Sequence, residues 1–474
     1  MVFASLVFLY IFLPLNLILY YVTKHAMYRN IVLTLFSFVF YAWGEPLWVM
    51  LLIGSAFVDW GNALWVDKAR GTKWAKAGVY SSVIFNIGLL VLFKYSGFLY
   101  ENVNAVFGTH YAIPEFILPV GISFKVFQTI SYVVDVYRGN IRTQRSVLKY
   151  VMFISLYHHL VAGPIVRYAH IAHEVDNRRF RIKDITAGIN RFCIGLFKKV
   201  FIANVAGTFV VKYMDGNLDQ LSTTEAWFGV IMFSAQIYFD FSGYSDMAIG
   251  LAKMFGFHFK ENFIYPYIAN SATDFWRRWH ISLGTFFRDY VYIPLGGNKR
   301  NWVLNLFIVW FLTGLWHGAS WNFILWGLYF GVLIFLERLF LQKVLNKIPR
   351  FISHVYLLFA AVLGWALFHI IDIHRLGKFL SILFGNSTQP TWSLPFQITL
   401  RENIYWIALT VILSMPVYGF VMKLIRRRAR RMKTLAPLSI SSWSTSMVFD
   451  FGVLFICTAL LVENSYNPFL YYRF

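Results

Sequence analysis

Long apolar runs constrain the fold of this chain more than any other feature. Val2 to Tyr21 is the first of them, and similar runs recur along the whole sequence. A helix that crosses a bilayer needs ~20 apolar residues, and a helix satisfies every backbone polar group within lipid. Only 14% of the 474 residues are charged, against about a quarter in soluble proteins. We therefore expect an all-α polytopic membrane protein.

The spacing of these runs predicts about eleven transmembrane helices. The sequence shows no internal repeat and no soluble appendage, so we expect a single domain over residues 1–474. Lys24, His25 and Arg29 follow the first run, which favours an N-terminus outside the cytoplasm. The further candidate spans are residues 31–43, 47–66, 77–93, 116–136, 149–166, 187–211, 226–252, 303–336, 352–371, 403–422 and 447–462.

Two stretches do not fit a simple span. Residues Asn301 to Leu336 contain no Asp, Glu, Lys or Arg. One straight helix of that length would measure about 54 Å, whereas the hydrocarbon core is ~30 Å thick. We expect the run to break at the small and polar segment Gly314–Ser320. Residues Ala272 to Gly297 mix aromatic and charged side chains, which is typical of an interfacial or re-entrant helix.

The basic surplus has its own explanation. Lys and Arg exceed Asp and Glu by 43 to 22, which gives a net charge of +21. Most of these cations lie in loops, as the positive-inside rule and contact with anionic lipid predict. No nucleic-acid recognition module accompanies the charge, so nucleic acid is not expected as a partner.

His317 lies in the middle of the long uncharged run. An ionisable residue at membrane depth indicates a functional site, and a histidine can act as general base for a hydroxyl. Thr313 lies one helical turn earlier and could orient the ring. The alternative is a structural histidine bonded to a helix carbonyl.

The segment Asp274–His280 is dense in aromatic and basic side chains. If it is helical, Trp276 and His280 share one face, and Asp274 can pair with Arg278. Arg277 and Arg278 could bind phosphates. The alternative is an aromatic belt anchored by arginines at the membrane surface.

Two carboxylates, Asp240 and Asp246, lie between apolar runs. Buried acids need partners, which the cationic segment 274–280 could supply. A pocket-forming role is favoured over acid–base catalysis.

The sequence has no phosphate-binding loop, no dinucleotide fingerprint and no metal-binding motif, so no metal site is expected. The aromatic segment 467–474 is either an interface anchor or a tail that inserts into a pocket.

Ten segments of the sequence stand out together. They are Met1–Leu9, Phe40–Trp43, Ser131–Gly139, Ala162–Ile165, Phe239–Gly250, Glu261–Phe263, Phe275–Ser282, Arg288–Asn298, Leu315–Gly318 and Pro468–Phe474. In this order they resemble the membrane-bound O-acyltransferase family, most closely its bacterial members that O-acetylate alginate, peptidoglycan and other polysaccharides. The resemblance covers nearly the whole chain.

The resemblance implies a helical funnel with a catalytic histidine at its centre, which corresponds to His317, and a supporting histidine at His280. It also implies an aromatic tail, residues 465–474, that presents Tyr471 for transient acylation, with Tyr472 as the alternative carrier. We further expect a group of residues around these to contact the substrate: Trp276, Arg277, Arg278, Trp279, Arg288, Asp289, Asp240, Asp246 and Trp316.

The resemblance implies acetyl-CoA as the cytosolic donor and a polysaccharide acceptor outside a bacterial inner membrane. Only the acyl group then needs to cross. Since the chain shows no Ser-His-Asp domain, a separate extracytoplasmic acyltransferase is expected as partner, with membrane lipids around the protein. Two alternatives stay open: transfer of D-alanine from a carrier protein to a wall polymer, and a transporter or flippase without acyl transfer.

Overall fold

The computed structural model of the protein describes residues 1–474 except 115, 418–419, 422, 425–436, 464–469 and 471–474. The described part is helical and contains no strand. Six helical stretches in it are long and apolar enough to cross a membrane, and three shorter apolar helices accompany them, Phe8–Tyr21, Ala26–Ala42 and Trp302–His317. The long stretches are Trp48–Lys68, Lys73–Phe107, Ile182–Tyr213, Trp321–Leu345, Arg350–His369 and Ser446–Glu463.

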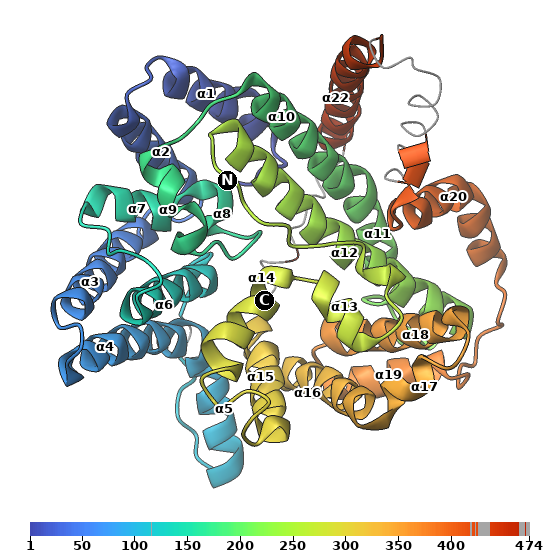
Figure 1. Cartoon of the computed structure of the whole chain (residues 1–474). Helices are drawn as coiled ribbons and strands as arrows, with labels where there is room; N and C mark the ends of the chain where they lie inside the picture. The colour runs from blue at the N-terminus through green and yellow to red at the C-terminus, as the bar shows by residue number, and fades with distance from the viewer. Residues whose placement is uncertain (115, 418–419, 422, 425–436, 464–469, 471–474) are drawn as a thin grey trace.

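The first third of the chain forms a bundle of helices on one side of the molecule (Figure 1). The expected span at 149–166 is wrong, because α7 ends at Ser155 and the chain leaves helical geometry at Leu156. The amide of Tyr157 instead donates to Ser37 Oγ at 3.1 Å. The helices are η1 Phe8–Phe12, α1 Leu13–Tyr21, α2 Ala26–Ala42, α3 Trp48–Lys68, α4 Lys73–Leu90, η2 Val91–Tyr95, α5 Ser96–Phe107, α6 Ile122–Arg138, α7 Val147–Ser155, α8 Tyr157–Leu160 and α9 Tyr168–Asp176.

The middle third places one long helix, α12, through the core. Its first turn carries a capping box between Ser222 and Glu225. Figure 1 shows α10 beside α12, with the short helices α13 and α14 near the centre of the view. The elements are α10 Ile182–Phe197, η3 Lys198–Ala203, α11 Asn204–Tyr213, η4 Leu218–Gln220, α12 Thr223–Met254, η5 Pro266–Ile268, α13 Ala272–Arg278, α14 Ile281–Phe287 and η6 Arg288–Tyr292.

The last third contains the predicted break in the uncharged run. Helix α15 ends at His317 and α16 begins at Trp321, so the break lies within the expected segment. The stretch 272–297 forms three short helices and no span, as the interfacial or re-entrant prediction requires. The C-terminal elements are α15 Trp302–His317, α16 Trp321–Leu336, η7 Glu337–Leu341, α17 Gln342–Leu345, α18 Arg350–His369, α19 Ile373–Leu383, α20 Leu394–Leu413 and α22 Pro437–Glu463.

Glycines allow α10 and α12 to cross at close range. A Cβ atom on Gly195 would lie 2.5 Å from the carbonyl oxygen of Gly243, and one on Gly250 would lie 2.6 Å from that of Gly188. Neither position could accept a side chain without moving a backbone. Small residues of this kind are the usual means by which membrane helices approach each other.

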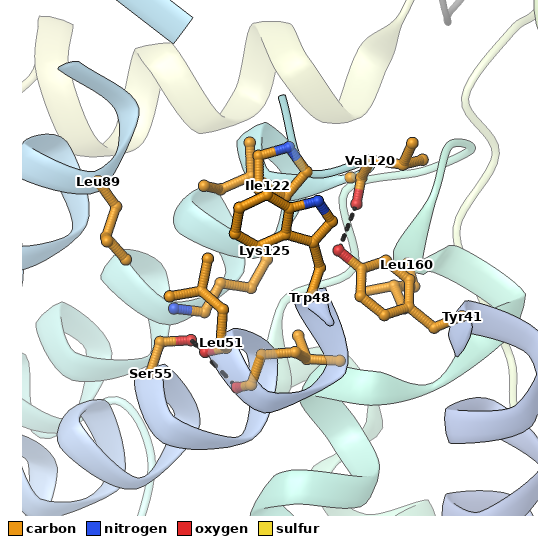
Figure 2. Close-up of a pocket in the computed structure, with 12 residues that line it drawn as sticks. Tyr41, Trp48, Leu51, Ser55, Leu89, Val120, Ile122, Lys125 and Leu160 are labelled. Carbon is orange, nitrogen blue, oxygen red and sulfur yellow. Dashed lines mark hydrogen bonds between the residues drawn. The ribbon is translucent and has the colours of Figure 1, made fainter. Parts of the chain in front are cut away.

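A buried ion pair joins α3, α4 and α6. Lys125 Nζ lies 3.3 Å from Asp59 Oδ2, and the other oxygen of Asp59 accepts from Ser82 and Asn86 at 2.7 Å each. Figure 2 shows Lys125 at a small cavity together with Trp48. Among the described residues, no candidate site residue lines this cavity, and its one cation, Lys125, is paired with Asp59.

Candidate active site

His280 and His317 line the same small cavity. It measures about 20 Å³ and lies between α6, α12, the α13–α14 link, α15, α16 and α18. Its walls are otherwise almost entirely aromatic. The remaining lining residues are Phe124, Ile237, Phe241, Trp279, Trp316, Trp326, Trp365 and Phe368. The structure therefore brings together two of the predicted catalytic residues with two of the predicted substrate residues, Trp279 and Trp316.

His317 is buried and has no hydrogen-bond partner for its side chain among the described residues, and its Nε2 atom is fully enclosed. The edges of Trp326 and Phe368 pack against the ring at centroid distances of 4.9 and 5.2 Å. Thr313 does not bond the ring, because its hydroxyl donates to the carbonyl of Val309 at 2.7 Å. His158 and His159 also have buried ring nitrogens without a partner among the described residues, so the position of His317 at the cavity is what distinguishes it.

Two side chains hold the C-terminal end of α15, and with it His317. Lys94 Nζ donates to the carbonyl of Trp316 at 2.6 Å, and Tyr95 donates to that of Leu315 at 3.0 Å. These carbonyls have no partner within the helix, and a cation at a helix C-terminus also complements the helix dipole. A Cβ atom on Gly314 would lie 2.3 Å from the carbonyl oxygen of Phe323 in α16. The packing of α15 on α16 thus depends on glycine at this position.

His280 lies between two helices and does not share a helical face with Trp276. Helix α13 ends at Arg278, and His280 has a left-handed φ of 44°. The helical prediction for 274–280 is therefore wrong at its C-terminal end. The cause is long-range pairing, because the amide of Ile281 donates to the carbonyl of Asn262 at 3.0 Å.

Asn262 fixes the turn that carries His280. Its side-chain oxygen accepts from the amide and the hydroxyl of Ser282 at 3.0 and 2.9 Å, and its amide group reaches Ser245 Oγ on α12 at 3.2 Å. Asn262 is 2% exposed. It connects the turn at His280 to the central helix.

Glu337 holds the other end of the short helices. One carboxylate oxygen accepts from the amide of Ala272 at 2.6 Å, and the other accepts from the amide and hydroxyl of Thr273 at 2.8 and 2.6 Å. A negative charge at a helix N-terminus satisfies free amides and complements the dipole. A buried acid in η7 therefore anchors α13 beneath the cavity.

The predicted phosphate-binding arginines do not line the cavity. Arg278 pairs with Asp274 at 3.1 Å, as the i, i+4 spacing predicts, and Arg277 is exposed. Arg288 is exposed and pairs with Asp289 at 2.7 Å.

Asp289 acts as the partner of two arginines, since its other oxygen accepts from Arg167 at 2.8 Å. Partial burial raises the pKa of the Asp289 carboxyl. The hydrogen bonds from Arg288 and Arg167 lower the pKa by more than burial raises it, so the net pKa lies below its usual value. This group stays ionised and paired at neutral pH.

The carboxylates of α12 find their partners on α10 and η3. Asp240 pairs with Lys199 at 2.7 Å, and Asp246 pairs with Lys198 and Arg191, each at 2.6 Å. The expectation that the segment 274–280 supplies these cations is wrong. The two acids of α12 pair with cations on the neighbouring helical segment. These partners could not be predicted from the sequence, because they lie far away along the chain.

The C-terminal segment reaches the same helix. The amide of Leu470 donates to Asp240 Oδ2 at 2.9 Å, and Leu470 is 2% exposed. The predicted acyl carrier Tyr471 and its alternative Tyr472 follow at once in the sequence, but both lie outside the described residues. Of the two readings of the tail, the contact of Leu470 supports insertion.

The model of the membrane-bound O-acyltransferase family matches residues 140–379. That range contains both cavity histidines. The chain is also 36% identical to the probable alginate O-acetylase AlgI of Pseudomonas putida, over all of both chains. The chain belongs to the membrane-bound O-acyltransferase family. As a member of that family it is an O-acyltransferase.

Two other relatives are named for different reactions, O-acetylation of peptidoglycan and D-alanylation of teichoic acid. The peptidoglycan O-acetyltransferase of Helicobacter pylori is 30% identical over all of this chain and 98% of its own. The teichoic acid D-alanyltransferase of Bacillus subtilis is 28% identical over 45% of this chain and 58% of its own. The similarity to the relatives named for O-acetylation thus extends further along the chain.

Three residues that position the candidate site were not predicted from the sequence: Asn262, Glu337 and Lys94. Asn262 lies within the motif Glu261–Phe263, which contributed to the family resemblance without an assigned role. Lys94 and Glu337 each stand at the end of a long apolar run, where charge is normally explained by the membrane surface. Their contacts with α15 and α13, which show that they support the candidate site, are visible only in the folded structure.

Proposed function

We propose that the protein passes an acetyl group from cytosolic acetyl-CoA across the bacterial inner membrane, through a C-terminal tyrosine, towards a cell-surface polysaccharide. The acceptor would be alginate-like or a cell-wall glycan. The observation that carries the proposal is the unpaired Nε2 atom of His317, enclosed in a cavity that His280 shares. The two relatives matched over the whole chain, named for alginate and peptidoglycan, support acetyl as the group transferred.

The first step is attack of the tyrosine phenol on the thioester. His317 takes the phenol proton, the phenolate oxygen bonds to the acetyl carbon, and the C–S bond breaks. The CoA thiolate then receives the proton from His317, which balances the step. His280 would support this exchange from the same cavity.

Two indole N–H groups are candidates to stabilise the oxyanion of this step. Trp316 and Trp326 both contact the His317 ring at centroid distances of 4.9 Å, and the Nε1 atom of each is buried without a partner among the described residues. Preorganised, unpaired donors in a site without water are the usual means of holding a developing negative charge.

The carrier is proposed to be Tyr471, with Tyr472 as the alternative. The hydrogen bond of Leu470 to Asp240 supports a tail that enters the helical domain, because α12 contributes Ile237 and Phe241 to the cavity wall. A phenol has a pKa of ~10 and leaves more readily than an aliphatic alcohol. The acyl-tyrosine therefore stays reactive enough to pass the group on to a separate extracytoplasmic acyltransferase with a Ser-His-Asp triad.

The cavity must widen when the enzyme works. A volume of about 20 Å³ admits a water molecule but not an acetyl thioester. The rings of Trp279, Trp316 and Phe368 line it, so their movement would open the central funnel that the family resemblance implies.

The test measures both the donor and the acceptor. Purified protein in proteoliposomes is given acetyl-CoA, and free CoA is followed; in cells, ester-linked acetate on the surface polysaccharide is quantified. We expect Tyr471→Phe to abolish glycan acetate and Tyr472→Phe to retain it. Loss in the second variant alone moves the carrier to Tyr472. Full activity of the double variant, or polymer export without release of CoA, would contradict the proposal and favour a transporter.

Replacing Asn262 by alanine is expected to lower acetyl transfer by about tenfold or more, because Ser282 loses a buried partner and the turn at His280 is released. Release of CoA by the purified variant measures the effect. Asn177→Ala, at an exposed site, is the matched control and should match the wild type. Wild-type activity of Asn262→Ala would show that the turn does not depend on this side chain.

A further inference from the structure

Two arginines, one buried and one partly buried, lie over one aromatic ring near the first turn of α2. The guanidinium carbons of Arg29 and Arg178 lie 5.1 and 5.8 Å from the ring centroid of Tyr20, and that of Arg29 lies 4.0 Å from the centroid of Phe180. Arg29 is only 5% exposed. Two like charges this close and this poorly solvated repel each other unless an anion is present.

No carboxylate pairs with either arginine among the described residues. Two acids act on Arg178 through their charge, but their closest contacts are with other groups: Asp176 pairs with Lys149 at 2.5 Å, and Glu174 pairs with His258 at 2.7 Å. The aromatic rings compensate part of the charge through cation–π contacts. They do not replace a counter-ion.

Several donors of the pair are unused. The side chain of Arg29 donates through Nε to the carbonyls of Thr23 and Tyr20 at 2.8 and 3.3 Å, and its terminal nitrogens have no partner in the described part of the chain. Arg178 bonds Asn30 through Nη2, while its Nη1 atom is buried without a partner. Burial lowers the pKa of the Arg178 guanidinium and the charge of Arg29 lowers it too, while Tyr20, Asp176 and Glu174 offset only part of this, so the net pKa lies below its usual value. A bound anion would remove this penalty.

We propose that Arg29 and Arg178 together bind the phosphate of an anionic phospholipid. The planar guanidinium group presents paired donors that match phosphate oxygens. Helices α1 and α2 and the residue that follows α1 expose apolar side chains on which lipid chains can lie. These are Ile18, Val22, Met27, Ile31 and Leu35, each at least 40% exposed.

The site adjoins the end of the central helix. Tyr20 donates to the carbonyl of Phe255 at 2.7 Å, and Tyr21 donates to that of Met254 at 2.5 Å. Arg178 also lies over the ring of Phe257, at 4.9 Å. A phosphate that neutralises the arginines would therefore stabilise the contact between α1 and α12. The site is separate from the acetyl-transfer cavity and does not depend on the proposed function.

The experiment uses the full chain purified in detergent. Native mass spectrometry compares retained dioleoyl phosphatidylglycerol with dioleoyl phosphatidylcholine for the wild type, Arg178→Gln, Arg178→Lys and Arg142→Gln. The last variant removes one exposed positive charge and is the matched control. The wild-type unfolding temperature is also measured with each lipid and with inorganic phosphate.

We expect the wild type and Arg142→Gln to prefer phosphatidylglycerol, and Arg178→Gln to lose affinity by about tenfold or more. Arg178→Lys keeps the charge but not the paired donors, so it should lie between them. In the wild type, phosphatidylglycerol should raise the unfolding temperature and phosphatidylcholine and inorganic phosphate should not, which tests the site even if a variant does not fold. Equal lipid retention by Arg178→Gln would overturn the proposal. So would an equal rise with inorganic phosphate, which would show that a free phosphate is the ligand.

Discussion

Replacing His317 by glutamine is expected to lower acetyl transfer by about a hundredfold to ten-thousandfold, the range for loss of a general base. Glutamine fills a similar volume but cannot take a proton. Stability should change little, because the histidine side chain makes no hydrogen bond with the described residues. The measurement is release of CoA from acetyl-CoA by purified protein, with the unfolding temperature recorded in parallel.

The matched control for this substitution is His110→Gln, at an exposed position. It removes a histidine without touching the cavity and should keep wild-type activity. Activity of His317→Gln within a few-fold of the wild type would show that His317 is structural. A large drop in both activity and unfolding temperature would also count against a purely chemical role.

Replacing Lys125 by methionine is expected to lower the free energy of unfolding by about 3–5 kcal/mol, because it leaves the carboxylate of Asp59 buried without its cation. Asp59 is fully buried within a candidate membrane span, and its remaining contacts, from Ser82 and Asn86, are neutral. Denaturant-induced unfolding in detergent micelles measures the loss.

The double variant Asp59→Asn with Lys125→Met separates the ion pair from packing. Removing both charges should recover much of the stability, since neither group is then left buried and unpaired. Lys73→Met, at the exposed start of α4, is the control and should cost less than about 1 kcal/mol. A loss below that value for Lys125→Met would show that the pair does not stabilise the α3–α4–α6 bundle.

Much of the fold follows from local sequence, and the predictions that were wrong failed because of contacts between residues far apart in the chain. The break after His317 was predictable because glycine and serine interrupt an uncharged run that is too long for one span. The break at Leu156 was not, because apolar residues flank it and the compensating bond comes from Ser37 on another helix. The predicted number of spans, about eleven, exceeds the six long and three shorter apolar helices described. The central funnel and the single domain stay predictions.

For the candidate site, the sequence predicted the key residues but not the contacts that position them. His317 and His280 were predicted, and both line one cavity. What the sequence could not provide is the pairing across helices. The partners of Asp240 and Asp246 lie about 40 to 55 residues away in the chain. The left-handed turn at His280 depends on Asn262, whose position only the fold reveals.

In the proposed function, an acyl group rests on the C-terminal tail before it leaves the membrane. Mass spectrometry of the C-terminal peptide, after brief incubation of purified protein with acetyl-CoA, can detect that group. We expect an acetyl adduct on Tyr471 in the wild type and none in His317→Gln. An alanyl adduct in cells would change the donor to D-alanine. An unmodified tail in a preparation that still releases CoA would contradict the tyrosine carrier.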